Sequence, residues 1–446
     1  MNLLLVLSHS AEVYEEILKS RRPADAVLSE YLRARKYLGS HDRKFISETV
    51  YGALREHLEL EKLACSFLSE QGLPARLNTV FILVFFLLRK GQVDADALLG
   101  AMQQKFAFKP ETLYAAVIAA SESKHLTDAT NPSALSQRHA FPEWMTARLL
   151  RHFDIQELDA LYHTLNTPAP LGLRVNTMKT SRAALQQILQ REGIETEEGL
   201  LSPDALLCRK RYNVMQTDAF RQGLFEIQDE GSQVISLLLN PKSGEKILDA
   251  CAGGGGKTLH LATLMKGRGR VFAHDKFEKR FGNIRLRIRR SGLQNIELIM
   301  PAMFEKFART HCGKLDAVLI DAPCSGSGTL RRNPDLKHRL SEGLLMRLAQ
   351  QQKDILSQYA PLVKTGGTVV YATCSLFREE NEEVVEAFLQ AHPSFTLVLP
   401  KAQLLNTAAG SSLSNLIAYL GEHSYLRLLP HQTNTDGFFA AVLMKN

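Results

Sequence analysis

The chain has 446 residues, which is more than one hydrophobic core usually serves, so we expect two or three domains. Hydrophobic residues make up 45% and charged residues 23%, a balance that excludes a disordered or fibrous protein. The net charge of +7 suits a polyanionic partner. Lys and Arg gather in three places, each of which taken singly is also typical of a solvated helix face: residues 209–211, 285–290 and 331–339.

The N-terminal residues, MNLLLVLSHSAEVYEE, hold a short apolar run with no preceding Lys or Arg, so we expect no secretory signal. The longest apolar run, VFILVFFLL at residues 80–88, is too short to span a bilayer and predicts a buried core helix. We therefore expect a cytoplasmic protein without a membrane partner. The 6 cysteines contain no CxxC pair, which argues against a zinc site and against a disulfide framework.

Residues 10–124 are predicted to be helical nearly throughout, with breaks at Pro23, Gly39 and Gly72. The polar, proline-bearing segment 127–142 is predicted to be a linker. We assign residues 1–130 to an all-helical domain.

Residues 142–230 predict a small α+β module. LGLRVNT is expected to be a strand, and Ser181 is expected to cap a helix that runs towards Arg191. Further short strands are expected around Leu206 and Val214.

Residues 231–446 predict an α/β domain with a Rossmann-like parallel sheet. Apolar runs bounded by glycines (KILDAC, RVFAHD, LDAVLIDAPC, GTVVYATCS) alternate with helical stretches, as parallel strands and crossover helices do. The last two runs, YLRLLP and GFFAAVLMK, have no crossover helix between them and are expected to form an antiparallel edge pair.

The first of these strands leads into DACAGGGGKT, a glycine-rich loop. A Walker A loop needs a glycine where this chain has Cys251, so a P-loop nucleotidase is disfavoured. A nucleotide-type ligand at the carboxyl edge of a parallel sheet fits better, because Asp275 ends the next strand where a ribose-binding acid belongs. A methyltransferase that uses S-adenosylmethionine and a dinucleotide-dependent dehydrogenase both fit this pattern, as does a glycine turn that serves packing alone.

Two cysteines favour the methyltransferase. Cys324 and Cys374 follow the fourth and fifth strands, which places both thiols at the edge that holds the glycine loop. Carbon 5 of a pyrimidine is a poor nucleophile until a thiolate adds to carbon 6, and a second thiol can then assist proton removal or product release. Asp321, just before Cys324, is placed to hydrogen-bond the base. The target base would have to be single-stranded or flipped out of its stack.

DAPCSGSGTLRRNPDLK, ATCSLFREENEEVV and PHQTNTDGFF resemble the Sun-type family of RNA 5-cytosine methyltransferases, and RVNTMK and FEIQDEGSQ also match. Residues 1–130, through HDRKFISETVYGALREH, are similar to the family's NusB-like RNA-binding domain. The resemblance covers nearly the whole chain and implies methylation of one cytosine of 16S ribosomal RNA, free or partly assembled, with S-adenosylmethionine as the cofactor. It implies no metal and demands nothing larger than a monomer.

The resemblance also assigns roles to residues of this chain. It implies that Cys374 is the nucleophile, that Cys324 is needed for release of the product, and that Asp321 lies near the methyl donor and the base. It places Asp275 on the ribose. The implied cofactor loop consists of Cys251, Ala252, Gly253, Gly254, Gly255, Gly256 and Lys257.

Two departures from the family pattern stand out. Gly253 and Gly254 replace the usual Ala-Pro, which should loosen the loop while keeping its N–H groups available. Pro301 stands where an acid usually lies beside the adenine, so we expect that contact to be weaker. The alternative function is an RNA-binding ribosome-assembly factor with a decayed cofactor site. The two cysteines, with Asp321 and Lys257, favour the enzyme.

Overall fold

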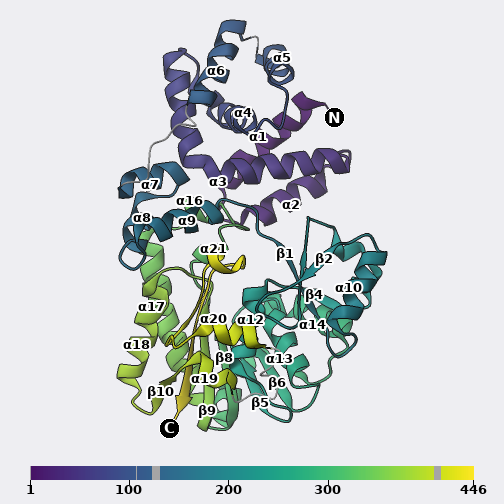
Figure 1. Cartoon of the computed structure of the whole chain (residues 1–446), viewed down its shortest axis with the longest axis vertical. Helices are drawn as coiled ribbons and strands as arrows, with labels where there is room; N and C mark the ends of the chain where they lie inside the picture. The colour runs from purple at the N-terminus through teal and green to yellow at the C-terminus, as the bar shows by residue number, and fades with distance from the viewer. Residues whose placement is uncertain (1, 107, 123–130, 406–412) are drawn as a thin grey trace. The chain divides into compact units, whose positions relative to one another are not determined.

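The computed structural model describes residues 2–106, 108–122, 131–405 and 413–446. The chain divides into two compact units (Figure 1). A helical unit comprises Met1–Thr167 and Leu330–Ser341, and an α/β unit comprises Pro168–Thr329 and Glu342–Asn446. The expected division into domains at 1–130, 142–230 and 231–446 stays a prediction.

The helical unit has the predicted breaks. Pro23 precedes α2, Gly39 precedes α3, and Gly72 follows α3. The apolar run 80–88 lies in α4, as predicted, and its side chains from Phe81 to Leu87 are buried. The main helices are α1 (Leu3–Lys19), α2 (Ala24–Ala34), α3 (Ser40–Glu70), α4 (Asn78–Lys90), α5 (Ala95–Phe106), α6 (Pro110–Glu122), α7 (Pro132–His139), α8 (Glu143–Leu149) and α9 (Ile155–Leu165).

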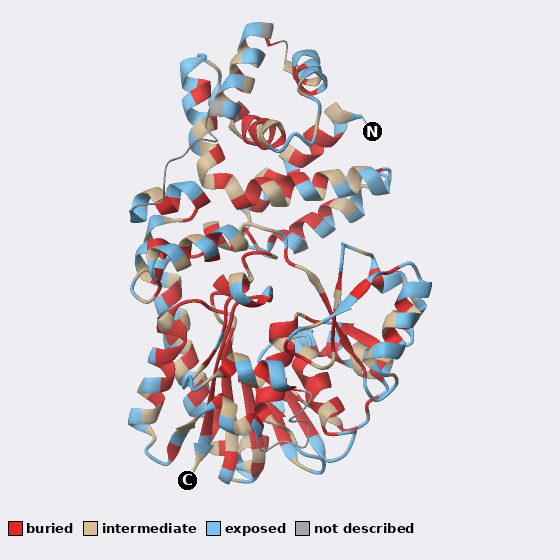
Figure 2. Cartoon of the chain, in the orientation of Figure 1, coloured by how far each residue is buried: buried red, intermediate tan, exposed pale blue. Residues whose placement is uncertain are grey.

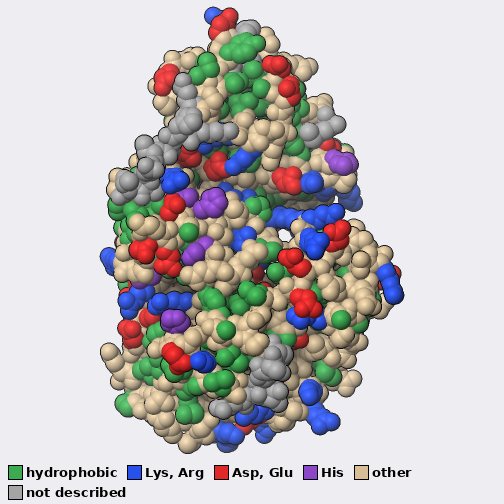
Figure 3. Space-filling model, viewed as in Figure 1, with side chains coloured by type: hydrophobic (Ala, Val, Ile, Leu, Met, Phe, Trp, Pro, Cys, Tyr) green, Lys and Arg blue, Asp and Glu red, His purple; other side chains and the backbone are tan. Residues whose placement is uncertain are grey.

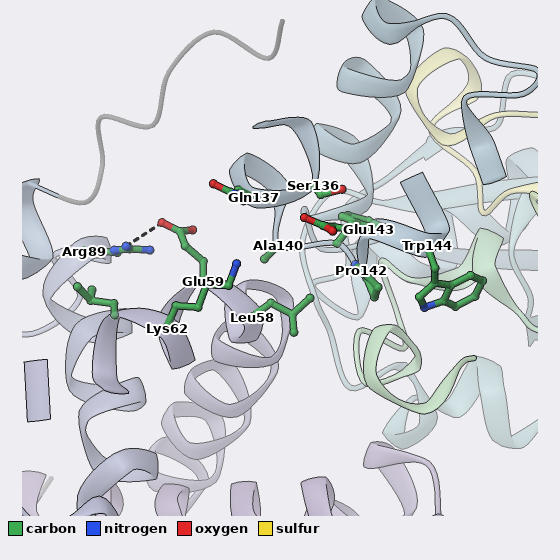
Figure 4. A pocket seen from close by; sticks show the side chains of 12 residues that line it. Leu58, Glu59, Lys62, Arg89, Ser136, Gln137, Ala140, Pro142, Glu143 and Trp144 are labelled. Carbon is green, nitrogen blue, oxygen red and sulfur yellow. Dashed lines mark ion pairs between the residues drawn. The ribbon is translucent and has the colours of Figure 1, made fainter. Parts of the chain in front are cut away.

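Helices α3 and α4 pack closely because Gly52 has no side chain. A Cβ built there would lie 2.0 Å from Cζ of Phe86, so the ring of Phe86 occupies that space. Elsewhere the unit is hollowed: a cavity of about 600 Å³ is lined by side chains of α3, α4, α7 and α8, including Trp144 (Figure 4). Arg89 and Glu59 form an ion pair of 2.8 Å at its wall.

The predicted linker is partly wrong. Residues 127–130 lie outside the described residues, but Pro132–His139 forms helix α7. Asn131 caps this helix by accepting a hydrogen bond from Ala134 N at 2.9 Å, and Pro132 occupies the first turn, where a missing N–H is tolerated. The proline that suggested a loop therefore begins a helix.

The segment Leu330–Ser341 belongs to the helical unit, although the sequence around it belongs to the α/β unit. It contains the short helix α16 (Leu336–Arg339). Lys337 is 2% exposed, and its Nζ donates to the carbonyl oxygens of Arg55, His139 and Ala140 and to Oδ1 of Asn166. Burial and the charge of Arg55 hold the pKa of Lys337 well below its ordinary value. The basic cluster 331–339 is therefore not a solvated face, because its lysine is interior.

The α/β unit begins with a four-stranded antiparallel sheet, in the order β2-β3-β1-β4. The predicted strand LGLRVNT is confirmed as β1, and Ser181 caps α10 (Arg182–Arg191) as predicted. The strand predicted around Leu206 is β3, whereas Val214 begins a 3-10 turn and not a strand. The strands of this sheet are β1 (Leu171–Val175), β2 (Thr196–Glu198), β3 (Ala205–Cys208) and β4 (Phe225–Ile227).

The second sheet of the α/β unit is doubly wound, as predicted. Its order is β10-β12-β9-β8-β5-β6-β7, and β5 to β9 are parallel. The order reverses between β5 and β8, which is where open α/β sheets bind ligands at their carboxyl ends. The strands are β5 (Lys246–Asp249), β6 (Arg270–His274), β7 (Ile296–Ile299), β8 (Leu315–Asp321), β9 (Val363–Thr373), β10 (Phe395–Val398), β11 (Leu426–Leu428) and β12 (Phe438–Lys445).

Helices cover both faces of this sheet, so its strands are buried on both sides (Figure 2). Neighbouring residues of one strand face opposite layers: Ile247 packs with α12 and α13, whereas Leu248 packs with α15, α17 and α18. This double burial explains the continuous apolar runs in the sequence. The covering helices are α12 (Glu230–Leu239), α13 (Gly256–Leu264), α14 (Phe281–Ser291), α15 (Pro301–His311), α17 (Glu342–Tyr359) and α18 (Glu382–Ala391).

The C-terminal strands pair as predicted, but they are not an edge pair. β11 and β12 are antiparallel, with Arg427 opposite Phe439. β12, however, is inserted between β9 and β10 and pairs with both. It therefore lies in the sheet interior, and Phe439 to Leu443 are at most 1% exposed.

Basic side chains do not cover the visible face continuously. In Figure 3, Lys and Arg lie among Asp and Glu in several places. The cluster 285–290 is divided, because Arg287 and Arg290 bind buried Glu226 while Arg285 and Arg289 are exposed. Among the described residues, no helix is long and apolar enough to cross a membrane.

Candidate active site

The glycine loop joins β5 to α13 at the switch point of the sheet. Gly253 and Gly255 have φ values of +55° and +81°, which L side chains rarely adopt, so the loop requires glycine at both positions. Ala252 N donates to the His274 carbonyl at 2.8 Å, and Gly253 N donates to Oδ2 of Asp275 at 2.9 Å. The loop is thus attached to the end of the neighbouring strand β6.

Asp275, the predicted ribose acid, lies beside this loop and is 2% exposed. Besides Gly253 N, its carboxylate accepts from Phe277 N at 2.8 Å and from Arg280 Nη1 at 2.6 Å. Pro301 is the first residue of α15, a position where the missing proline N–H is tolerated. Pro301 therefore has a local role as the start of a helix.

Two arginines hold the glycine loop through hydrogen bonds to its carbonyl oxygens. Neither contact was predicted from the sequence. Arg174 Nη1 donates to the Gly256 carbonyl at 2.7 Å, and Arg287 Nη1 donates to the Gly254 carbonyl at 2.6 Å. Arg287 Nε also donates to Oε2 of buried Glu226 at 3.0 Å. Burial lowers the pKa of Arg174 to about 10. An arginine with this pKa is still charged at neutral pH. The two arginines thus stabilise a loop that has Gly253 and Gly254 in place of the more rigid Ala-Pro pair.

The family resemblance implies S-adenosylmethionine as the ligand of this loop, and S-adenosylhomocysteine is its demethylated form. We expect Arg287→Ala to weaken binding of S-adenosylhomocysteine about tenfold, because the Gly254 carbonyl loses a charge-assisted hydrogen bond and the loop loses its link to Glu226. Isothermal titration calorimetry measures the affinity without any RNA. Arg289→Ala is the matched control, since Arg289 lies on the same helix and is exposed. Equal affinity in the two variants would show that the loop does not depend on Arg287.

Asp249, which ends β5, is buried and accepts a hydrogen bond from Thr258 Oγ1 at 2.6 Å. Burial raises its pKa to about 7, against the opposing effect of Thr258. The carboxyl of an unfolded chain titrates near 4. Between about pH 4 and pH 7 the folded state therefore binds the extra proton, and the free energy of unfolding falls as the pH rises through this window.

We expect the change in the free energy of unfolding caused by Asp249→Asn to be about 2–4 kcal/mol more favourable at pH 8 than at pH 4. The reason is that the buried carboxyl is ionised at pH 8, whereas the amide never ionises. Urea denaturation at the two pH values measures the difference. Asp354→Asn, at an exposed position of α17, is the control. A pH-independent effect of Asp249→Asn would contradict the prediction.

The two predicted thiols lie together. β8 and β9 are adjacent and parallel, with Asp321 opposite Ala372, so the chain leaves both strands at the same edge. Sγ of Cys324 and Sγ of Cys374 are 3.3 Å apart. The hydrogen bond with Cys374, and then burial, raise the pKa of Cys324 well above its ordinary value. Cys324 is thus held as a protonated thiol that can donate to Cys374.

Lys257 connects the glycine loop with the end of β8. Its Nζ lies 2.6 Å from Oδ2 of Asp321, and the lysine side chain is 10% exposed. Burial opposes the charged form of Lys257, but the Asp321 carboxylate outweighs burial and raises the pKa of the lysine. Cys374 is a further cause that raises the pKa of Lys257. Lys257 was predicted to belong to the cofactor loop, and its ion pair with Asp321 was not predicted.

Cys251 also belongs to the loop, and burial, followed by the nearby carboxylates, raises the pKa of its thiol. Within the described residues, no group of His, Cys, Asp and Glu is arranged to hold a metal ion. The doubly wound sheet, the glycine loop at its switch point and the two thiols at the same edge together define a Rossmann-like methyltransferase domain.

Comparisons with known proteins give the particular family. Residues 236–444 match the family described as 16S rRNA methyltransferase RsmB/F, and residues 141–215 match the ferredoxin-like domain of RsmF/B-like methyltransferases. The chain belongs to the RsmB/F family.

Two curated relatives carry the same name, probable ribosomal RNA small subunit methyltransferase B. The Bacillus subtilis protein is 37% identical over 311 residues, covering 70% of this chain and 68% of its own length. The Synechocystis protein is 31% identical over 428 residues and covers 92% of each chain.

Two solved structures are also similar. The crystal structure of PH0851 has a TM-score of 0.74 at 26% identity, covering 98% of this chain and 97% of its own. A methyltransferase homolog protein from Pyrococcus horikoshii has a TM-score of 0.58 at 28% identity, covering 71% of this chain and 100% of its own.

Proposed function

We propose that the chain methylates carbon 5 of a cytosine in 16S ribosomal RNA, with S-adenosylmethionine as the methyl donor. The observation that carries the proposal is the pair of thiols, 3.3 Å apart, at the carboxyl ends of β8 and β9. A paired nucleophile and second thiol beside an ion pair suit the covalent route to a methylated pyrimidine carbon.

The glycine loop fits the proposed cofactor. Among the described residues, a Cβ added at Gly253 would have only the Cys251 carbonyl within 4 Å, at 3.8 Å, so the space beside this backbone is open. We propose that residues 251–257 hold the cofactor and that the Asp275 carboxylate binds its ribose, exchanging Arg280 for the sugar hydroxyls. When bound, S-adenosylmethionine supplies an electrophilic methyl group.

In the proposed reaction, the Cys374 thiolate forms a bond to carbon 6 of the cytosine, and the ring electrons move to carbon 5. Asp321 binds the polar edge of the base, and Lys257 balances the negative charge in the site. After carbon 5 has gained the methyl group, its proton must leave, and the bond from Sγ to carbon 6 breaks to restore the aromatic ring and the thiolate.

Cys324 is suited to accept the carbon 5 proton after the bond between Cys374 and carbon 6 has formed. Its hydrogen bond with Cys374 is the largest cause of its raised pKa. Once Cys374 is bonded to carbon 6 this cause is removed, so Cys324 can give its own proton to water and then take the proton from carbon 5. The state of Cys324 would thus depend on whether the adduct has formed.

The proposal is tested with protein, methyl-labelled S-adenosylmethionine and 16S rRNA, supplied free or in small-subunit particles. We expect label in the RNA and one protected cytosine in bisulfite sequencing. Label on another base would contradict the proposed chemistry. RNA binding without label would support the alternative, an assembly factor with a decayed cofactor site.

A further inference from the structure

We propose that Glu380 is a positioning residue that fixes the loops of both thiols against each other. Glu380 lies in the 3-10 turn Arg378–Glu380 after β9, is 0% exposed, and its carboxylate binds Ser325, Gln352 and Ser375. The inference rests on the proposed function, in which Cys324 and Cys374 act together.

The loop of Cys324 is held on both sides of the thiol. Ser325 N, directly after the cysteine, donates to Oε1 of Glu380 at 2.8 Å. Gln352, a buried residue of α17, donates through Nε2 to the Pro323 carbonyl at 3.0 Å and to Oε1 of Glu380 at 2.9 Å. Ser325 is therefore attached to the Glu380 carboxylate directly, and Pro323 is attached to it through Gln352.

The loop of Cys374 is held by the other oxygen of the same carboxylate. Ser375 Oγ donates to Oε2 of Glu380. Asn381, the next residue along the chain, donates to the Ser375 carbonyl at 2.9 Å and accepts a hydrogen bond from Thr373 Oγ1. Both neighbours of Cys374 are thereby fixed.

Two backbone N–H groups also join the two loops directly: Gly328 N donates to the Cys374 carbonyl at 2.9 Å, and Leu376 N donates to Ser327 Oγ at 2.8 Å. Glu380 adds a buried carboxylate that binds both loops at once.

The backbone of Glu380 is fixed as well, because the Tyr371 hydroxyl donates to its carbonyl at 2.6 Å. Three donors point at the carboxylate, from Ser325 N, Gln352 Nε2 and Ser375 Oγ, which is how a protein stabilises a buried anion. Burial raises the pKa of Glu380, and these hydrogen bonds oppose that effect. A site that served packing alone would not need a carboxylate here.

The charge of Glu380 has a second effect, on the thiol itself. After the hydrogen bond with Cys374 and burial, the carboxylate is a further cause that raises the pKa of Cys324. Cys374 and Glu380 act on Cys324, and Tyr371 lies close enough to respond to the charge of Cys324. Lys257 interacts with Asp321 and with Cys374. Removing the negative charge should therefore lower the pKa of Cys324, which a merely structural role would not do.

The test compares Glu380→Gln and Glu380→Ala with Glu383→Gln, a control at an exposed position of α18. Glutamine keeps an acceptor for Ser325 N, and the Ser375 hydroxyl can rotate to accept from the new amide. We expect Glu380→Ala to lower kcat about 10²-fold with little change in KM for RNA, as a small misplacement of reacting groups does. Glu380→Gln should restore kcat to within about tenfold of the wild type.

A readout without RNA separates this inference from the proposed function. Alkylation of each cysteine by iodoacetamide, followed by mass spectrometry as a function of pH, reports the thiols directly. In Glu380→Gln we expect the Cys324 profile to move to lower pH, and in Glu383→Gln to stay in place. An unmoved Cys324 profile in Glu380→Gln, or wild-type kcat in Glu380→Ala, would overturn the proposal. If the wild type methylates nothing, the proposed function fails while the alkylation profile still decides the role of Glu380.

Discussion

Replacing Cys374 with alanine is expected to lower methyl transfer to 16S rRNA at least about 10³-fold, because the covalent route loses its nucleophile. The neighbouring thiol cannot substitute, since burial still favours the protonated form of Cys324 after the hydrogen bond with Cys374 is lost. Transfer of labelled methyl groups to RNA measures the loss. Cys312→Ala is the matched control, because Cys312 is an exposed thiol of the same unit.

Cys324→Ala should behave differently and accumulate a covalent complex of protein and RNA. Without the second thiol, loss of the carbon 5 proton is slow and the bond to Cys374 persists. A denaturing gel resolves this complex, and adding Cys374→Ala to the same chain should abolish it. If the two single variants behave alike, or if the complex survives in the double variant, the assignment of the two roles is wrong.

Lys337→Met is expected to lower the free energy of unfolding of the helical unit by about 3–5 kcal/mol. The methionine removes the shared donor of four acceptors, on Arg55, His139, Ala140 and Asn166. Of these, the His139 carbonyl keeps a hydrogen bond from Asn166 Nδ2 at 2.9 Å. It also removes the contact of Nζ with the Phe141 ring, 3.8 Å from its centroid. Urea denaturation followed by tryptophan fluorescence measures this unit, because the chain has 1 tryptophan, Trp144 in α8.

The control for this prediction is Lys36→Met, which removes a lysine at an exposed position of the same unit. It should change the free energy of unfolding by less than about 0.5 kcal/mol. A similarly small effect of Lys337→Met would show that water or a rearranged backbone satisfies the four acceptors.

Much of the fold could be predicted because the strongest signals are local. Continuous apolar runs such as KILDAC and GTVVYATCS identify strands buried on both faces, and they are β5 and β9. The position of β12 between β9 and β10 could not be predicted, because a run of apolar residues does not specify which strands flank it. Helix α7 was missed because Asn131 and Pro132 are typical of both loops and helix starts.

The candidate site divides in the same way. Strand ends placed Cys324, Cys374, Asp275 and the glycine loop at one edge, because parallel strands share their carboxyl edge. The residues that support them could not be found from the sequence. Arg287 reaches Gly254 across 33 positions, and Gln352 reaches Pro323 across 29. Such contacts depend on tertiary packing, and no spacing or periodicity in a single sequence encodes them.

The insertion of Leu330–Ser341 into the helical unit bears on the order in which the chain can fold during synthesis. Lys337 is synthesised long after its acceptors on Arg55, His139 and Asn166. These acceptors therefore have no lysine donor until the second half of the chain has been made. The helical unit therefore lacks part of its structure until the segment that follows Cys324 has been synthesised. A fragment that ends at residue 167 would lack Leu330–Ser341, and with it the Lys337 donor.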